Sequence, residues 1–400
     1  MDGLNDMKIL ILGCYYSANL GDGVICECVA DQILRAFPNA EIMIRDLWHR
    51  SAFDNRQKRI TDFKVSDKQL VYRRLRGDLY KFITRFLHWD VQFISTQNRL
   101  HESQAHLDRV CATECDLVVF AGGQMFMDAY SLRLWYVIRH FEEKGIPVIL
   151  NACGLGPTYS KKLRSHLREA LSAPNVLAAS CRDDVQGVNK YYSAAGEIVQ
   201  ETFDPALGCS KCYGITKERA AEVIGLGIMG TSRISPKYAL RFWHELILEL
   251  EKKGIPWRVF VNGEKIDIAF ARYVIETLPG SKRCLEDCIV PIPVVPQQLV
   301  ETISQFRSII SFRLHSHIIA TSLDIPSVAV VWDDKVRIFF EKIGHPERCC
   351  TLQSSPYEVM EKLIVAEREG YDRSLIEKQK RFSKEWLINA INEASLKRQS

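Results

Sequence analysis

The sequence KILILGCYYSANLGDG at residues 8–23 joins a short apolar segment to the start of a helix. Residues 8–12 are almost wholly apolar, which is typical of a strand that is buried on both faces of a parallel sheet. Residues 23–37 then carry apolar side chains at helical spacing. A strand that runs directly into a helix is the first half of a βα unit. This stretch therefore predicts an α/β fold built around a mainly parallel sheet.

The rest of the chain repeats this alternation of short apolar runs and longer amphipathic segments. We expect further strands at residues 40–44, 117–120, 147–151, 176–179, 224–228, 257–261, 289–290, 308–311 and 327–331. We expect helices at residues 130–144, 161–172, 236–253 and 315–323.

Residues 204–217 interrupt the alternation, because Asp, Pro, Gly and Cys cluster there without periodicity. We expect this segment to separate an N-terminal domain, residues 1–207, from a C-terminal domain, residues 215–365. Ligands of open α/β sheets bind outside the carboxyl ends of the strands. Two such domains that face each other would form a ligand-binding cleft between them.

Two segments lie outside the βα pattern. Residues 370–400 predict a charged amphipathic helix at the C-terminus. Residues 56–105 predict a helical insertion in which arginine and lysine alternate with large aromatic residues. Such a segment can rest on an anionic membrane surface or hold a lipid-linked substrate. The alternative is an insertion whose aromatic side chains pack in the core and whose basic side chains face solvent.

The composition is that of an ordinary globular protein. Fifty-three basic and 49 acidic residues give a net charge of only +4, so we expect no nucleic-acid partner. The 13 cysteines are odd in number and lie in strand-like segments, which indicates reduced thiols in a cytosolic protein. No segment is a secretory signal or a membrane span. We expect a cytoplasmic protein that at most lies peripherally at the inner face of the plasma membrane.

Two cysteine pairs suggest a zinc site. They are Cys209 with Cys212 and Cys284 with Cys288. Their spacing is loose compared with that of structural zinc sites, and a βαβ unit is predicted between them. We therefore expect no metal.

Glycine-containing turns follow three strands of the N-terminal domain, at residues 13–23, 121–124 and 152–157. Glycine lets a ligand approach the backbone closely, and a helix N-terminus favours an anion or a polar oxygen. In the first turn, the Asn19 amide can both donate to and accept from a sugar hydroxyl group. Asp22 either caps the following helix or acts as a base toward a hydroxyl group.

In the C-terminal domain, the strand at residues 308–311 leads into Arg313 and His315 at the start of a helix. A guanidinium group, an imidazole and free backbone N–H groups together form a receptor for phosphate or carboxylate. Lys335, one strand later, and Arg182, at the end of another strand, would add positive charge to the same cleft.

These residues also have purely structural interpretations. Arg313 could form an ion pair at a helix end, and Arg182 could pair with Asp183 or Asp184. His317 could be a capping or core histidine rather than a ligand-binding residue. Guanidinium groups that are buried against internal carboxylates, or that point to opposite sides of the molecule, would overturn the interpretation of a receptor for a doubly anionic ligand.

Taken in chain order, these motifs resemble the polysaccharide pyruvyl transferase family over residues 8–345. The resemblance rests on Gly13, Asn19, Gly21, Asp22, Asp116, Ala121 to Gly123, Arg182, Asp183, Asp204 to Leu207, Arg313 to His315, Ile325, Pro326, and Lys335 with Phe339. Three positions depart from the family pattern. Ala121 stands where a third glycine is common, Gly23 where an acidic or small residue is more usual, and Trp332 where tyrosine is frequent.

The resemblance implies two Rossmann-like domains that face a cleft, as in GT-B glycosyltransferases. It implies a transferase that moves the enolpyruvyl group of phosphoenolpyruvate onto two hydroxyl groups of a sugar as a cyclic ketal. Phosphoenolpyruvate would be a co-substrate, with no cofactor, and a free or lipid-linked glycan would be the acceptor. We expect donor binding by Arg182, Arg313, Leu314, His315 and Lys335, acceptor binding by Asn19, Gly21, Asp22, Gly122 and Gly123, and catalysis by His315, Asp22 and Arg313.

Two other functions fit the same pattern. The first is a GT-B glycosyltransferase that uses a nucleotide sugar, which would also need a carboxylate to bind a ribose, and no clear glutamate lies near Arg313. The second is a sugar-binding or scaffold protein without enzymatic activity, which would release no phosphate from phosphoenolpyruvate.

Overall fold

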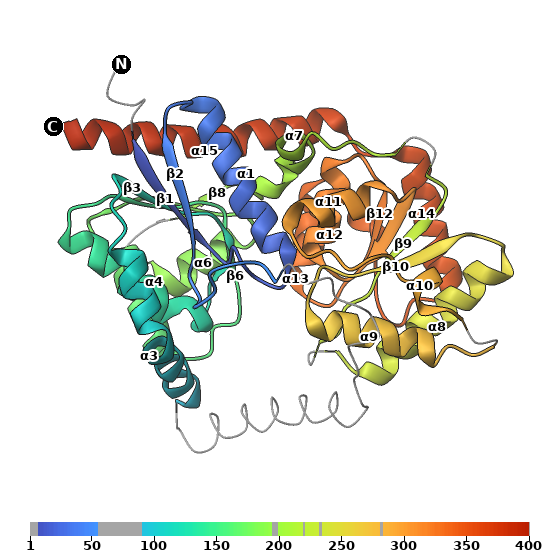
Figure 1. The fold of residues 1–400 in the computed structure, drawn as a ribbon. Helices are drawn as coiled ribbons and strands as arrows, with labels where there is room; N and C mark the ends of the chain where they lie inside the picture. The colour runs from blue at the N-terminus through green and yellow to red at the C-terminus, as the bar shows by residue number, and fades with distance from the viewer. Residues whose placement is uncertain are drawn as a thin grey trace.

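The computed structural model describes residues 7–54, 90–193, 199–218, 221–231, 234–280 and 283–399. Two sheets organise these residues, as Figure 1 shows. The first has the strand order β2-β1-β3-β5-β7-β8, and all its neighbouring strands are parallel. Its strands are β1 (Lys8–Gly13), β2 (Glu41–Asp46), β3 (Leu117–Phe120), β5 (Val148–Leu150), β7 (Val176–Cys181) and β8 (Gln200–Glu201).

The second sheet has the order β10-β9-β11-β12-β13 and is also parallel throughout. Its strands are β9 (Ile224–Gly227), β10 (Trp257–Phe260), β11 (Ser308–Ser311), β12 (Ser327–Val330) and β13 (Cys349–Cys350). The predicted strand at residues 289–290 is wrong, because Ile289 forms only an isolated bridge to Val259. The α/β class is confirmed. The domain boundaries at residues 207 and 215 stay a prediction.

Helices cover both faces of each sheet, which is why strands such as β3 and β11 are buried along their whole length. The helices of the N-terminal part are α1 (Leu20–Ala36), α3 (Val91–Cys111), α4 (Asp128–Glu143), α5 (Lys161–Leu171) and α6 (Val185–Tyr192). Those of the C-terminal part are α8 (Pro236–Lys252), α9 (Lys265–Glu276), α10 (Leu285–Cys288), α11 (Pro296–Ser304), α12 (Leu314–Ser322), α13 (Asp334–Lys342), α14 (Pro356–Glu369) and α15 (Arg373–Gln399).

The two sheets meet through a shared apolar core. Buried side chains of α1, α11, α12 and α15 belong to one hydrophobic cluster together with residues of β1 and β3. At this junction the Leu20 N–H group donates to the Asn262 carbonyl oxygen over 2.9 Å. Leu20 follows the carboxyl end of β1 and Asn262 follows that of β10. The ligand-binding edges of the two sheets therefore face each other.

The segment between the sheets is more ordered than its sequence predicts. It forms the 3₁₀ helix η3 (Pro205–Gly208) and the short helix α7 (Cys209–Tyr213), and both pack against α1 and α12. Two predicted glycine turns also become strands, because β4 (Gly123–Phe126) and β6 (Cys153–Leu155) pair in parallel. The structure thus replaces three expected loops with hydrogen-bonded elements.

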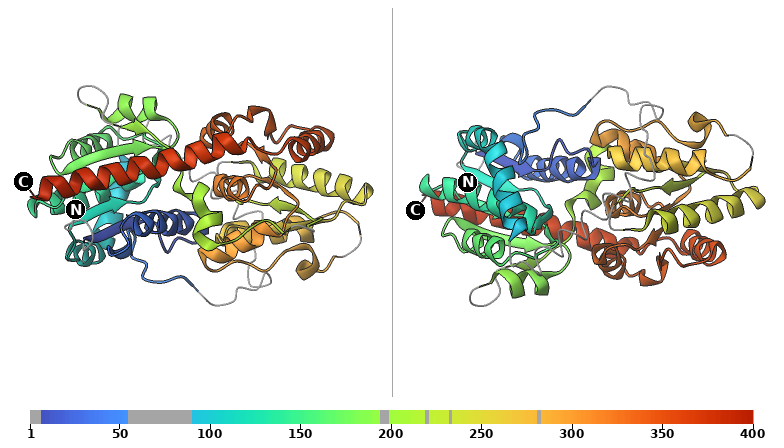
Figure 2. Two further views of the ribbon diagram at one scale, coloured as in Figure 1. Left: turned by 90° about the horizontal axis from the view of Figure 1, so that it is seen from above. Right: turned by 90° about the horizontal axis from the view of Figure 1, so that it is seen from below.

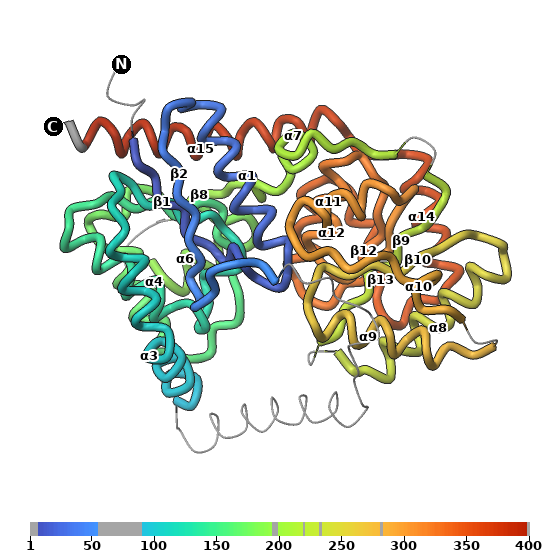
Figure 3. The backbone as a smooth tube through the Cα atoms, in the orientation of Figure 1, coloured from blue at the N-terminus to red at the C-terminus, as the bar shows by residue number. Residues whose placement is uncertain are grey.

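Helix α15 confirms the predicted C-terminal helix. It runs from the C-terminal part back across the N-terminal sheet, as Figure 2 shows, and Figure 3 traces the same path from α14. Leu387, Ile391 and Ala394 are buried in the shared core. The helix therefore connects both halves of the molecule.

The predicted insertion is described only in part. Its second half lies in α3, which begins at Val91. Residues 56–89 lie outside the described residues, so the membrane-surface hypothesis stays a prediction. In the part of the chain that the structure describes, no helix is both long enough and apolar enough to cross a membrane.

Candidate active site

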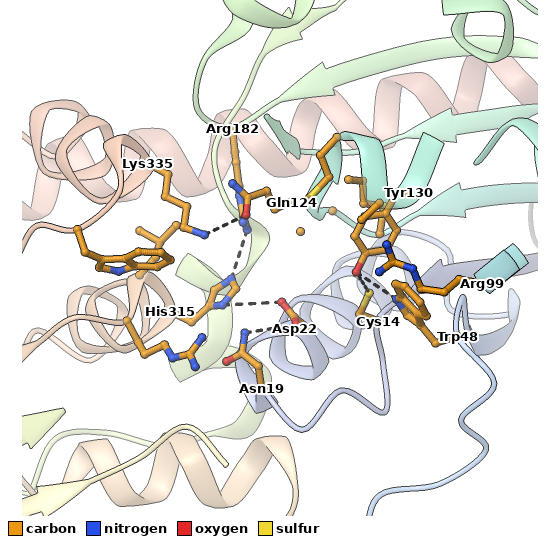
Figure 4. Close-up of a pocket in the computed structure, with 18 residues that line it drawn as sticks. Cys14, Asn19, Asp22, Trp48, Arg99, Gln124, Tyr130, Arg182, His315 and Lys335 are labelled. Atoms are coloured by element: carbon orange, nitrogen blue, oxygen red, sulfur yellow. Dashed lines mark hydrogen bonds and ion pairs between the residues drawn. The ribbon is translucent and has the colours of Figure 1, made fainter. Parts of the chain in front are cut away.

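A pocket of about 380 Å³ lies where the carboxyl ends of the two sheets meet, and Figure 4 shows its side chains. The N-terminal part contributes Asn19, Asp22, Gly122, Gly123 and Arg182 to its lining, and the C-terminal part contributes Arg313, Leu314, His315 and Lys335. All predicted site residues except Gly21 therefore line one cavity. Its volume is within the usual range for small-ligand sites.

Gly21 has a different place from the one predicted. It lies in the first turn of α1 and packs against the ring of His315, where a Cβ atom would come within 2.4 Å of the His315 Cβ and Cγ atoms. The absence of a side chain is thus what allows α1 and α12 to approach each other. Gly21 supports the site from behind rather than offering bare backbone to a ligand.

Gly122 and Gly123 follow β3 with φ angles of +113° and +93°. Residues with side chains rarely adopt these angles, so glycine is needed at both positions. The next residue, Gln124, accepts a hydrogen bond from Lys335 Nζ over 3.1 Å. Lys335 also lies 5.2 Å from the ring centre of Trp332. These contacts hold the lysine ammonium group at the pocket wall.

The two arginines differ from the prediction in their partners. Arg182 pairs with Asp204, and neither side chain is more than 4% exposed. Arg313 forms a two-fold contact with Asp267, through Nε at 2.9 Å and Nη2 at 2.8 Å. The ion-pair interpretation of Arg313 is therefore confirmed, since Asp267 lies in the first turn of α9, whereas the pairing of Arg182 with Asp183 or Asp184 is wrong. The physical reason is burial, because a buried guanidinium group needs a counter-charge.

Both arginines still face the pocket, with their aspartates behind them. Arg182 Nε is buried and has no hydrogen-bond partner within the described residues. A guanidinium group has five N–H donors, so an aspartate leaves some of them for a ligand. The pairing fixes the direction of these donors but cancels much of their charge.

His315 lies between two side chains from other segments of the chain, Arg182 and Asp22. Its Nε2 atom is 3.3 Å from Arg182 Nη1, and its Nδ1 atom is 4.0 Å from Asp22 Oδ1. An arginine can only donate, so Nε2 accepts and Nδ1 carries the hydrogen. Burial lowers the pKa of His315 well below its usual range, and the charges of Arg182, Lys335 and Arg313 lower it further. The ring is therefore neutral and points an N–H group toward Asp22.

Asp22 is the carboxylate of the pocket that faces His315. Burial raises the pKa of Asp22 to about 6, against the opposing effect of Arg182. Asn19 Nδ2 donates to Asp22 Oδ2 over 3.3 Å, while Asn19 Oδ1 is buried without a partner among the described residues. The pair thus offers a carboxyl group whose pKa lies close to neutral pH and an amide oxygen that can still accept a hydrogen bond. Both groups suit a ligand hydroxyl group.

His317 is a core residue. It is fully buried, Nε2 is 3.0 Å from the Ser311 carbonyl oxygen, and the ring packs edge-on against Phe340. Burial lowers the pKa of His317 to about 4. The structural interpretation of this residue is confirmed. As for a metal, the described residues contain no cluster of three or more ligand side chains.

The sequence analysis did not single out the side chains at the far side of the pocket. These are Cys14, Trp48, Arg99 and Tyr130. Trp48 lies two residues after the carboxyl end of β2, a position that could have marked it as a site residue. Arg99 and Tyr130 lie on helices, and nothing in their local sequence distinguishes them.

The fold is similar to that of several solved sugar-nucleotide enzymes. The UDP-N-acetylglucosamine 2-epimerase of Methanocaldococcus jannaschii matches with a TM-score of 0.54 at 12% identity, over 97% of this chain and 99% of that one. A putative enzyme of the same name from Listeria monocytogenes gives 0.55 at 9% identity over 96% and 95%. The trehalose 6-phosphate synthase of Burkholderia multivorans gives 0.52 at 9% over 98% of each chain. The protein therefore has a GT-B-like fold with two Rossmann-like halves.

The family follows from the sequence as a whole. The model of the polysaccharide pyruvyl transferase family matches residues 19–334, which is most of the chain and includes all the site residues predicted here except Lys335. The chain belongs to this family. No curated protein matches it closely enough to refine this assignment.

Proposed function

We propose that the protein transfers the enolpyruvyl group of phosphoenolpyruvate to two hydroxyl groups of a surface or exopolysaccharide sugar, or of its lipid-linked precursor. The observation that carries this proposal is the arrangement of Asp22, His315 and Arg182 across one pocket. It brings together, where the two sheets meet, a carboxyl group whose pKa is close to neutral pH, a neutral imidazole and a guanidinium group. Ketal formation needs groups that donate and remove protons, and binding of an anionic donor needs cationic groups.

The proposed reaction begins with protonation of C3 of phosphoenolpyruvate, which gives C2 oxocarbenium character. One sugar hydroxyl group forms a bond to C2, the bond from C2 to the phosphate oxygen breaks, and the second hydroxyl group closes the ketal. Two hydroxyl protons are released; one balances the proton added at C3 and the other leaves with inorganic phosphate. The reaction therefore needs both proton donation and proton removal.

Asp22 is proposed to accept the proton of the attacking hydroxyl group. Asn19 would hold the sugar by accepting a hydrogen bond from its second hydroxyl group through Oδ1, which has no partner among the described residues. His315 is the proposed contact to the phosphate or to a proton in transfer, since its N–H group faces the pocket side of Asp22. Because the ring is neutral, it would act as a hydrogen-bond donor rather than as a fixed cation.

Donor binding is proposed to depend on Lys335 together with the remaining N–H groups of Arg182 and Arg313. Asp204 and Asp267 neutralise much of the charge of the two arginines. Recognition of the phosphate and carboxylate groups would therefore depend more on the fixed directions of the guanidinium N–H groups than on net charge. Preorganised donors of this kind are effective in sites that exclude water.

The test is incubation of the protein with phosphoenolpyruvate and a panel of glycan acceptors. Release of inorganic phosphate together with an acceptor product of the mass of a pyruvyl ketal would support the proposal. His315→Ala is the matched inactive variant, and His317→Ala controls for the loss of a buried imidazole. Phosphate release without a sugar product, or no turnover with any acceptor, would count against it.

The alternative is a glycosyltransferase that uses a nucleotide sugar, and the fold similarity to sugar-nucleotide enzymes favours testing it. In the same assay, UDP-sugars replace phosphoenolpyruvate. Consumption of a UDP-sugar with no consumption of phosphoenolpyruvate would establish the alternative.

A further inference from the structure

The pocket extends away from His315 to a second end, which we call the aromatic end. It is formed by Trp48, Tyr130 and Arg99, which come from the segment after β2, from α4 and from α3. Figure 4 shows these side chains on the opposite side of the pocket from Lys335 and His315, with Asp22 between the two groups. A ligand that fills the cavity would contact both ends.

Trp48 is held in one orientation. Its Nε1 atom donates to Tyr130 Oη over 3.2 Å, and its backbone N–H group donates to the Asp46 carboxylate over 2.7 Å. The guanidinium group of Arg133 lies 3.6 Å from the centre of the indole ring. The Tyr130 ring meets Trp48 edge-on. A rigid aromatic surface of this kind can pack against the apolar face of a ligand ring at little entropic cost.

The aromatic end also carries positive charge. Arg133 is buried, and its hydrogen-bond acceptors are the carbonyl oxygens of Ala129 and Arg99 and the hydroxyl group of Ser103. Burial lowers the pKa of Arg133 to about 10, so the group stays protonated at neutral pH.

Arg99 lines the pocket itself, and its guanidinium group donates to the backbone and side chain of Ser95. Unlike Arg182 and Arg313, neither Arg99 nor Arg133 has a carboxylate within ion-pair distance in the described part of the chain. Arg99 and Arg133 thus differ from the two predicted donor-site arginines in having no direct carboxylate partner in this part of the chain, and the nearby Asp46 carboxylate instead accepts from the Trp48 backbone N–H group.

We propose that the aromatic end is the acceptor subsite and that it takes a sugar bearing an anionic group, either a phosphate or a carboxylate. The sugar ring packs on Trp48 and Tyr130, and Arg99 binds the anionic group through charge-assisted hydrogen bonds. This placement points the opposite edge of the ring toward Asn19 and Asp22. The inference deepens the proposed function and rests on it, because it names the class of acceptor for the same pocket.

Titration calorimetry without any donor tests the subsite. The probes are the methyl glycosides of glucose, galactose, mannose and N-acetylglucosamine, the matching sugar 1-phosphates, and methyl glycosides of glucuronic and galacturonic acid. For at least one sugar we expect an anionic form to bind about tenfold more tightly than the neutral glycoside, which corresponds to one charge-assisted contact. The 1-phosphate and uronate arms distinguish a phosphate from a carboxylate.

Arg99→Gln should remove this tenfold preference and leave the neutral glycosides unchanged. Arg109→Gln, an exposed arginine on the same helix, is the matched control and should keep the preference. Trp48→Leu should weaken both classes of sugar, with thermal unfolding measured to verify that this variant is folded.

The proposal is overturned if no anionic sugar binds the wild-type protein, or if Arg99→Gln keeps the preference. It is also overturned if Lys335→Gln, rather than Arg99→Gln, removes the preference, since the anionic group would then lie at the opposite end. Phosphoenolpyruvate is titrated separately, and Arg99→Gln should bind it like the wild type. A wild-type protein that binds anionic sugars but not phosphoenolpyruvate would refute the proposed donor and leave the subsite standing.

Discussion

At the residue scale, aspartates set the positions of the two arginines of the site, whereas Gln124 and Trp332 hold Lys335. Asp204 holds Arg182, Arg182 donates to His315, and His315 turns its N–H group toward Asp22. Each contact determines the hydrogen-bonding role of the next group. A change in one aspartate should therefore affect more than the charge that it carries.

Asp22→Asn replaces the carboxylate that we propose as the base by an amide of similar size, which cannot accept the proton. With phosphoenolpyruvate and a productive acceptor, we expect kcat to fall roughly 10²- to 10⁴-fold. The base form of the wild-type carboxylate accumulates as pH rises through about 6, so the wild-type rate should rise over the same range. The rate that remains in Asp22→Asn should lack this dependence. A variant with the wild-type rate and pH profile would contradict the assignment.

Asp204→Asn should destabilise the protein. Arg182 would stay buried without its counter-charge, and breaking a buried ion pair in this way costs roughly 3–5 kcal/mol in the free energy of unfolding. Asp31→Asn is the control, because the Arg35–Asp31 pair is a solvent-accessible helix pair whose loss should have a much smaller effect on stability. Chemical denaturation measures the free energy of unfolding of both variants. Equal effects would show that Arg182 is solvated in solution.

At the element scale, the decisive feature is the approach of α1 to α12. The starts of both helices follow strand ends, and their N-terminal residues Asn19, Asp22 and His315 meet in the pocket. Most strands of both sheets were predictable along the chain, because buried parallel strands and amphipathic helices have distinct periodicities. The contact between the two helices was not, because Gly21 reads from sequence as a ligand-binding glycine rather than a packing one.

Gly21→Ala should therefore separate these helices. The new Cβ atom would collide with the His315 ring, and overpacking of this kind costs roughly 1–3 kcal/mol. We expect lower thermal stability together with a loss of turnover, since His315 must move. Gly208→Ala is the matched control, because its Cβ atom would meet only Gln32 Nε2 at 3.8 Å. A stable and fully active Gly21→Ala variant would be inconsistent with this packing.

At the scale of the whole molecule, α15 ties the two halves together. Ser383 Oγ donates to the Phe203 carbonyl oxygen, Trp386 Nε1 donates to Gln200 Oε1, and Gln379 Nε2 donates to the Lys342 carbonyl oxygen. The helix thus contacts the N-terminal sheet and the end of α13. Its packing should contribute to the fixed distance between the two sides of the pocket.

Leu387→Ala tests this connection. Leu387 is fully buried, and its truncation should lower the free energy of unfolding by roughly 2–5 kcal/mol. Leu396→Ala, on the same helix but 65% exposed, should change it by less than about 0.5 kcal/mol. Denaturant titration of the two variants makes the comparison. Similar stabilities would mean that α15 is not docked in solution.

The sequence alone indicated the α/β class and the C-terminal helix, and nine of the ten residues that it predicts at the site line one pocket. These features are local, because strand burial, helix spacing and the position of a residue at a strand end are all visible within a few residues. The tertiary structure decided which carboxylates face the arginines and that the pocket has an aromatic end. Arg182 and Asp204 are 22 positions apart, Arg313 and Asp267 are 46 apart, and Trp48 and Tyr130 are 82 apart. Such pairings depend on how two sheets and their helices pack, which no local pattern records.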